Sequence, residues 1–197
     1  RKGELGSYYS IKDYTAINDE YGSLEDFKVL VAEAHDRDML VILDWVANHT
    51  AFDHHWTSIE GYHTTDQAGN IISPEGTDWT DVADLNYDNK AMRRAMIKEM
   101  KWWVEETDLD GFRCDVAGMV PNDFWAEAIE QLEEVKELFM LAEWDDPSLH
   151  KAGFEMTYAW GSHHWINQVA KDEMTVSELE SRLLEDIERF PLGSIRM

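Results

Sequence analysis

The sequence predicts an α/β fold built on a parallel sheet, the arrangement found in α/β barrels. Short apolar runs typical of buried strands alternate with stretches of helical periodicity over most of the 197 residues. Runs at residues 39–46, 109–116 and 138–144 each carry a carboxylate near the C-terminal end. The carboxylates belong to Asp44, Asp115 and Glu143. Because the C-terminal ends of parallel strands converge on one mouth of a barrel, we expect these side chains to meet in one pocket.

The first predicted helix covers residues 23–36, and the first predicted strand follows at 39–46. Ser23 and, three residues later, Asp26 form a start that resembles a capping box. Apolar residues then recur at helical spacing, at Phe27, Leu30, Val31 and Ala34. The strand is a nearly continuous apolar run, as expected when both faces of a parallel sheet are covered.

Residues 48–83 interrupt the alternation of strands and helices. They show no sustained period and are rich in His, Trp, Thr, Asp and Gly. A segment of this length is too long for an ordinary connection between two elements, so we expect a functional excursion or a small subdomain.

The alternation resumes after this excursion and continues to the end of the chain. Helices are predicted at 89–107, 122–137, 162–171 and 177–189, and strands at 109–116, 138–144 and 154–160. Asn122 is the expected N-cap of its helix, because its side chain can accept a backbone hydrogen bond there. A stripe of Met side chains, Met92, Met96 and Met100, lies on one helical face and indicates core packing.

Composition and charge exclude several classes of function. The formal net charge of −24 opposes binding to nucleic acid or to an anionic membrane surface, and it favours a neutral substrate. A single cysteine, Cys114, rules out a disulfide within the chain. The sequence has no run of about eighteen apolar residues, which a membrane segment would need. It also has no Gly-rich loop of the kind that binds nucleotides.

An Asp and a Glu that face each other in one pocket have the chemistry needed to cleave a glycosidic bond. Asp115, in its ionised form, would act as the nucleophile, and Glu143 would act as the general acid and base. Residues i and i+2 of a strand share one face, so Arg113 is expected to point into the same mouth as Asp115 and to hold its charge. The alternatives are a purely structural ion pair for Arg113 and Asp115, and an exposed strand-end carboxylate for Glu143.

Five segments resemble, in order and spacing, the signatures of the α-amylase family of retaining glycoside hydrolases. They are YSIKDY at 9–14, DWVANH at 44–49, VADLN at 82–86, GFRCD at 111–115 and AEW at 142–144. The flanking sequence is most similar to bacterial α-amylases of the Bacteroidetes type.

The resemblance covers nearly the whole chain and implies a partial (β/α)8 TIM barrel with an inserted irregular domain B after the third strand. Residues 1–49 and 84–197 would belong to the barrel, the catalytic domain A. Residues 50–83 would form the excursion that corresponds to domain B.

The resemblance also implies roles for individual side chains, with Asp115 and Glu143 in the catalytic positions. The implied substrate-binding residues are Tyr9, Asp44, His49, Arg113 and Trp144. Among these, Tyr9 would stack on the sugar at the cleaved bond, and Asp44 would brace the guanidinium inside the pocket. His49 would form a hydrogen bond with a hydroxyl of the same sugar.

Asn48 and Asp84 match positions that bind a structural calcium ion in many relatives. Side-chain oxygens of these types suit a hard cation, which would pin the excursion to the barrel. The alternative is a polar clasp of hydrogen bonds without a metal. Inside the excursion, Trp56 and Trp79 are candidate platforms for a sugar ring.

The chain departs from the family pattern in two places. The fourth signature, which carries a His and a third Asp at the end of the seventh strand, is not found, and residues 191–197 resemble the approach to that strand. The chain therefore looks like the middle of a barrel, from before the second helix to after the sixth strand. Residues 116–119 stand where many amylases place a Lys-His pair that binds the sugar on the leaving side, so hydrolysis and transfer both stay open.

The leading interpretation is an enzyme that cleaves α-1,4-glucosidic bonds in starch-like glucans, with an α-glucan or maltooligosaccharide as substrate. One alternative is a transglycosylase or a relative that acts on disaccharides. Another is a non-catalytic, amylase-like carbohydrate-binding protein, which the presence of both carboxylates disfavours. By resemblance, we expect the parent protein to be secreted or periplasmic.

Overall fold

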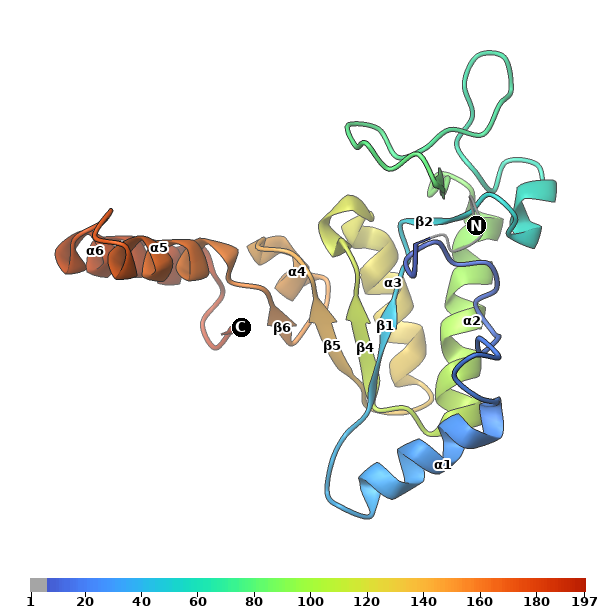
Figure 1. The fold of residues 1–197 in the computed structure, drawn as a ribbon, viewed down its shortest axis with the longest axis horizontal. Helices are drawn as coiled ribbons and strands as arrows, with labels where there is room; N and C mark the ends of the chain where they lie inside the picture. The colour runs from blue at the N-terminus through green and yellow to red at the C-terminus, as the bar shows by residue number, and fades with distance from the viewer. Residues whose placement is uncertain (1–6) are drawn as a thin grey trace.

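The centre of the fold is a five-stranded parallel sheet, seen in a computed structural model that describes residues 7–197 (Figure 1). In spatial order the strands are β1 (Ile42–Trp45), β4 (Gly111–Cys114), β5 (Phe139–Ala142), β6 (Met156–Thr157) and β7 (Ile195–Arg196). Spatial order follows chain order, and every neighbouring pair is parallel. This is the strand order of a (β/α)8 barrel, so the predicted partial barrel is confirmed. Residues 1–6 of its predicted first part lie outside the described residues.

The strand register brings the C-terminal ends of three neighbouring strands to one edge of the sheet. Asp44 on β1 is paired with Arg113 on β4. Asp115 and Glu143 directly follow the last residues of β4 and β5, which are paired with each other. The functional candidates from three separate parts of the sequence therefore start from adjacent backbone positions.

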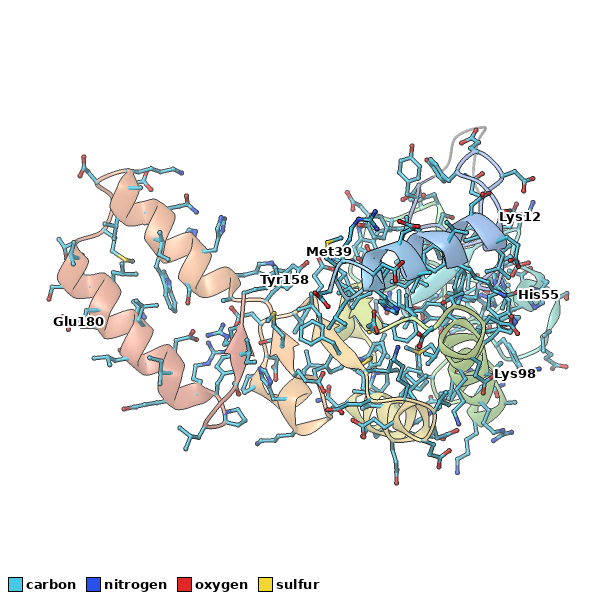
Figure 2. All side chains as sticks on the ribbon, turned by 90° about the horizontal axis from the view of Figure 1, so that it is seen from below. Lys12, Met39, His55, Lys98, Tyr158 and Glu180 are labelled. Carbon is cyan, nitrogen blue, oxygen red and sulfur yellow. The ribbon has the colours of Figure 1, made fainter. Side chains whose placement is uncertain are left out.

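Helices connect the strands, and the first four of them bury apolar residues in the core. They are α1 (Leu24–His35), α2 (Lys90–Thr107), α3 (Asn122–Glu133), α4 (Pro147–Lys151), α5 (Trp160–Ala170) and α6 (Val176–Arg189), with short 3-10 turns η1 (His55–Ser58) and η2 (Ala117–Met119). The predicted Met stripe of α2 is fully buried in the core. Helices α5 and α6 form a hairpin that extends away from the sheet (Figures 1 and 2). None of the helices in the described part combines the length and the apolar character needed to cross a membrane.

The helix starts follow the local sequence with one correction. The capping box at the start of α1 is confirmed, because Ser23 Oγ accepts the Asp26 N–H and the Asp26 carboxylate accepts the Ser23 N–H. The prediction that Asn122 caps α3 is wrong. Pro121 is the N-cap residue, with no side-chain hydrogen bond. The Asn122 side chain instead donates to Ser148 Oγ at 2.8 Å and so ties α3 to α4.

The excursion is closed at its base by a small antiparallel pair of strands, β2 (His49–Ala51) and β3 (Val82–Asp84). The segment between them lies beyond the C-terminal end of β1 in Figure 1. Trp56, in η1, is only 2% exposed and packs against Tyr14 and Tyr62. The prediction that Trp56 offers a platform to a sugar ring is therefore wrong, because a buried indole has no free face.

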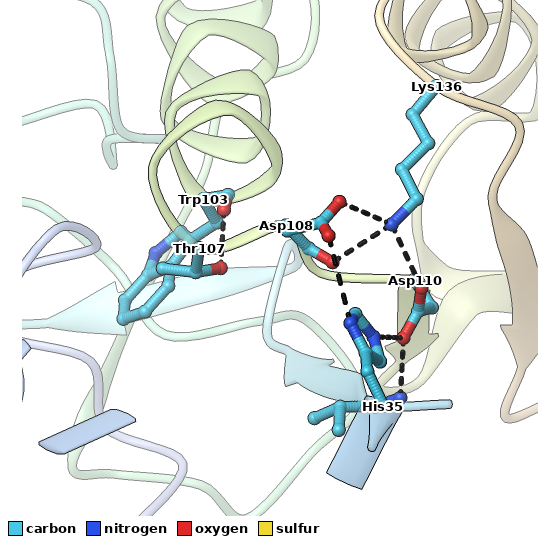
Figure 3. Close-up of polar contacts among 7 residues, drawn as sticks. His35, Trp103, Thr107, Asp108, Asp110 and Lys136 are labelled. Atoms are coloured by element: carbon cyan, nitrogen blue, oxygen red, sulfur yellow. Dashed lines mark hydrogen bonds and ion pairs between the residues drawn. The ribbon is translucent and has the colours of Figure 1, made fainter. Parts of the chain in front are cut away.

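The opposite, N-terminal end of the sheet is held by a polar cluster around Asp110 (Figure 3). The Asp110 carboxylate is buried and accepts the Val41 N–H at 2.7 Å, lies 2.7 Å from His35 Nε2, and lies 2.9 Å from Lys136 Nζ. Lys136 also reaches the carboxylate of Asp108, at 2.7 Å. The cluster joins α1, β4 and the segment after α3 at the end of the barrel away from the predicted chemistry.

Candidate active site

Arg113 is the centre of the site and binds all three predicted carboxylates. Its Nη1 atom lies 2.6 Å from Asp44 Oδ1 and 2.8 Å from Asp115 Oδ1, and its Nη2 atom lies 2.8 Å from Glu143 Oε1. A guanidinium presents several N–H donors in a fixed plane, so one side chain can hold several carboxylates in a defined geometry. Adjacent strand ends supply these side chains, as the register requires.

A pocket of about 360 Å³ opens above this cluster. The predicted residues that line it are Tyr9, His49, Arg113, Asp115 and Glu143, together with the predicted sugar platform Trp79. Ser7, Asp81, Val82 and Val116 line it too, and sequence reasoning did not single them out. The lining thus combines a carboxylate pair with aromatic rings, which is the chemistry of a sugar-binding cleft.

The carboxyl of Asp115 is tuned by burial and by its two neighbours. Burial raises its pKa from the ordinary value of 3.8 to about 6, and the negative charge of Glu143 acts in the same direction. Hydrogen bonding to Arg113 opposes this shift. For Arg113, burial alone would lower the pKa, but its bonds to Asp44, Tyr158 and Asp115 outweigh burial and raise it. The guanidinium therefore stays charged, and the two carboxyls share a strongly coupled site.

Glu143 has a partner on each of its carboxylate oxygens. Oε1 binds Arg113, and Oε2 accepts the backbone N–H of Val116 at 2.9 Å. Its side chain is 20% exposed, compared with 11% for Asp115. The better access to solvent suits a group that exchanges protons with a leaving group and with water.

Tyr9 lines the pocket, whereas Asp44 is in contact with Tyr9 but is not among the lining residues. The Tyr9 hydroxyl donates to Asp44 Oδ2 at 3.4 Å, and the charge of Asp44, followed by partial burial, raises the pKa of Tyr9. The ring is 43% exposed, so it has surface to offer to a bound sugar. Asp44 contacts Arg113 at 2.6 Å, and its predicted role in binding substrate inside the pocket stays a prediction.

His49 and Trp79 form another part of the pocket lining. Their rings meet edge to face with centroids 5.4 Å apart. Burial lowers the pKa of His49 to about 4, so its imidazole is neutral at pH 7. Asn48 Nδ2 lies 3.2 Å from His49 Nδ1 and fixes the ring. A neutral imidazole next to an indole can exchange a hydrogen bond with an uncharged hydroxyl.

Trp144 lies beside the pocket rather than among the residues that line it. Its half-buried indole packs edge to face on Trp160, with centroids 5.6 Å apart, and lies against Gly118. Trp144 directly follows Glu143, so its packing fixes the backbone that carries this carboxylate. Its predicted contact with substrate stays a prediction.

Asn48 and Asp84 lie on neighbouring segments at the base of the excursion. Asn48 O accepts the N–H of Leu85, and His49 is paired with Asp84. Burial raises the pKa of Asp84, against a hydrogen bond from Thr64 that lowers it. These two side chains offer hard oxygen ligands of the kind calcium prefers. Within residues 7–197, no group of three or more His, Cys, Asp or Glu side chains is arranged to hold a metal ion.

Tyr158 is a further residue that sequence reasoning missed. It lies at the junction between the sheet and the α5–α6 hairpin (Figure 2), and its hydroxyl accepts Arg113 Nε at 3.4 Å. The Arg113 guanidinium lies 5.9 Å from the centroid of the Tyr158 ring, a cation–π distance. Tyr158 directly follows β6, so its position at a strand end is the signal that could have found it.

Comparison with known proteins agrees with this geometry. The model of the α-amylase catalytic domain matches residues 5–69 and 76–194. The chain is 30% identical to trehalose-6-phosphate hydrolase of Bacillus subtilis over 214 aligned positions, covering 92% of the chain and 36% of that protein. It is 31% identical to α-amylase 3 of Dictyoglomus thermophilum, covering 70% of the chain and 33% of that protein.

Solved structures agree as well. The maltogenic α-amylase AmyB of Thermotoga neapolitana superposes with a TM-score of 0.89 and 38% identity, covering all of the chain and 46% of that structure. An α-amylase of Lactobacillus plantarum superposes with a TM-score of 0.92 and 36% identity, covering all of the chain and 50% of that structure. The chain thus spans about a third of these curated relatives and about half of these structures. With matches over nearly its whole length, the chain belongs to the α-amylase catalytic-domain family.

Proposed function

We propose that the protein containing this chain cleaves α-1,4-glucosidic bonds of starch-like glucans with retention of configuration. The observation that carries the proposal is the placement of Asp115 and Glu143 on the two terminal nitrogens of Arg113, in one pocket. Retaining glycosidases hold their two carboxyls about 5–5.5 Å apart, whereas inverting enzymes leave room for a water between them. Two carboxyls close enough to share a guanidinium and shift a pKa favour the retaining arrangement.

In the first step, Asp115 attacks the anomeric carbon while the bond from this carbon to the glycosidic oxygen breaks. Glu143 gives its proton to that oxygen, so the leaving sugar departs as a neutral alcohol. In the second step, Glu143 takes a proton from water, and the water oxygen replaces Asp115 on the anomeric carbon. Arg113 stays charged throughout and offsets the negative charge of whichever carboxyl is ionised.

The pocket supports a neutral sugar as substrate. Among its described lining residues, Arg113 is the single Lys or Arg, and its N–H groups are engaged by three carboxylates. A phosphorylated sugar would need an additional cation, so the chemistry favours an α-glucan or maltooligosaccharide over the phosphorylated disaccharide named for the relative in Bacillus subtilis. Other relatives are named oligo-1,6-glucosidase and cyclomaltodextrinase, which makes the choice of linkage part of the proposal.

The test is turnover of soluble starch and maltooligosaccharides by the complete protein, with the first-formed anomer followed by NMR. We expect α-configured products, and we expect Asp115→Asn to remove nearly all turnover while sugar binding persists. Asp123→Asn is the control, because Asp123 lies on an exposed surface ion pair away from the pocket. Binding without turnover in the unsubstituted protein would favour a carbohydrate-binding role. Products longer than the supplied maltooligosaccharide would point to a transglycosylase, and turnover confined to disaccharides would point to a disaccharide-acting relative.

Two further parts of the proposal concern a bound calcium ion and the cellular location of the enzyme. Asn48 and Asp84 would contribute oxygen ligands to a calcium ion that links the excursion to the barrel, supported by the half-buried carboxylate of Asp84. Export of the complete protein to the periplasm or the medium would bring it to polymeric glucans, and cell fractionation tests this.

A further inference from the structure

Two contacts join the turn after β4 to the segment that carries Glu143. The first is the hydrogen bond from the Val116 N–H to Glu143 Oε2, at 2.9 Å. Val116 has a φ of 39°, in the left-handed region that β-branched residues rarely adopt. Such a conformation is unfavourable for a β-branched residue and persists only where the surrounding structure holds it, often at a functional site.

The second contact is between Gly118 and the indole of Trp144. A Cβ atom at position 118 would overlap Nε1, Cε2 and Cδ1 of Trp144, well inside van der Waals contact. The absence of a side chain at Gly118 therefore makes the seat for this indole. Because Trp144 directly follows Glu143, the seat fixes the backbone from which the carboxylate projects.

Both sides of this contact are anchored to the rest of the fold. On one side, Trp125 of α3 is fully buried and donates from Nε1 to Ala117 O at 3.0 Å. On the other side, Tyr158 N–H donates to Trp144 O at 3.1 Å, and Trp160 packs on the indole. Neither the turn nor the tryptophan can move without breaking contacts to a helix or a neighbouring strand.

We infer that the turn of residues 116–119 aims the general acid, with Val116 and Gly118 as positioning residues for Glu143. The inference rests on the proposed function. The turn that follows the nucleophile Asp115 thereby also holds the acid, so the positions of the two carboxyl groups are fixed relative to each other. A side chain at position 118 would displace the indole of Trp144 and move Glu143 away from the leaving oxygen.

The test compares a leaving group that needs a proton with one that does not. The sugar that leaves maltotriose needs a proton from Glu143 on its glycosidic oxygen. Fluoride leaves α-maltosyl fluoride as an anion and needs no proton. In the complete protein, we expect Gly118→Ala to lower kcat/KM for maltotriose about a hundredfold, as for a misplaced catalytic group. We expect kcat/KM for α-maltosyl fluoride to change by less than about threefold, because kcat/KM reports the first step, and this step needs no acid catalysis when fluoride leaves.

The matched control is Gly161→Ala, which adds the same methyl group next to another tryptophan. Its Cβ would lie 3.3 Å from the Trp165 ring, outside the site, and we expect no change for either substrate. Trp144→Leu is the second variant, since it empties the seat without adding a methyl to the turn, and the same selective loss of kcat/KM is expected.

The outcomes separate this inference from the proposed function. Equal loss on both substrates in Gly118→Ala and Trp144→Leu, or no loss on either, overturns the positioning role. A loss confined to KM in Trp144→Leu also overturns it, because it would mark a residue that only binds sugar. If the unsubstituted protein cleaves neither substrate, the proposed function itself fails.

Discussion

Replacing Arg113 with Lys tests whether the fork of the guanidinium, and not only its charge, organises the site. Arg113 binds Asp115 through Nη1 and Glu143 through Nη2, both at 2.8 Å, with its side chain 15% exposed. An ammonium is a point charge that cannot hold both carboxylates in this geometry. Asp44 is 46% exposed, so water compensates for the loss of its bond.

The expected loss of kcat follows from the hydrogen bond that the substitution removes. Lys can keep one of the two buried carboxylates, so one charge-assisted hydrogen bond disappears, which is worth roughly 1.5–3 kcal/mol. At 1.36 kcal/mol for each tenfold change in rate, kcat should fall roughly 10- to 150-fold if the bond is lost in the transition state. The assay is steady-state turnover of maltotriose by the complete protein, with thermal melting to verify the fold.

The matched control is Arg37→Lys, since Arg37 pairs with Glu33 on the exposed surface of α1, where both side chains are 59% exposed. We expect its turnover and stability to stay nearly unchanged, because exposed pairs contribute little. Retention of kcat within about threefold in Arg113→Lys would refute the claim that the fork geometry matters.

Further predictions concern pH, metal and stability. Asp115 must be ionised to attack, and its pKa is raised to about 6, so kcat/KM should rise with pH through about pH 6 with a slope of one proton; a profile already flat from about pH 4 would contradict this. Chelation with EGTA should lower the melting temperature of the complete protein, and Asn48→Ala with Asp84→Ala should remove that effect; equal melting curves with and without EGTA would argue against calcium. Asp110→Asn should destabilise the fold by roughly 1.5–3 kcal/mol at pH 7, because the buried carboxylate loses charge-assisted contacts with His35 and Lys136, whose side chains are 28% and 31% exposed. Burial would raise the pKa of Asp110, but hydrogen bonds hold it below the ordinary value, so its stabilisation is present above about pH 4 and is lost at lower pH, where the melting difference between the two proteins should shrink.

The strands that position the site could be predicted because their signal is local. Buried parallel strands are apolar runs, and the runs that hold β1, β4 and β5 are visible in the sequence. The predicted strand at 154–160 contains β6, whereas β7, with two residues, is too short to set a pattern. The N-cap of α3 was mispredicted because Asn122 is a good capping residue, but Pro121, with its fixed φ, takes that position in the turn.

The candidate site could be predicted in part, since Arg113 and Asp115 are two residues apart in one strand and must share a face. The left-handed backbone of Val116 and the approach of Tyr158 to Arg113 could not, because they depend on the packing of strands distant in sequence. Trp56 and Trp79 look alike in a segment without periodicity, and only packing assigns one to the core and the other to the pocket.

The most direct measurement is to trap the glycosyl-enzyme in the complete protein with a fluorinated α-glycosyl fluoride and to locate the label by mass spectrometry of peptides. A retaining mechanism requires a covalent bond between the sugar and the nucleophile. We predict one label on the peptide that contains Asp115, and no label in Asp115→Asn. A label on another carboxylate, or turnover of the reagent to β-configured product without a label, would contradict the assignment of Asp115 and Glu143.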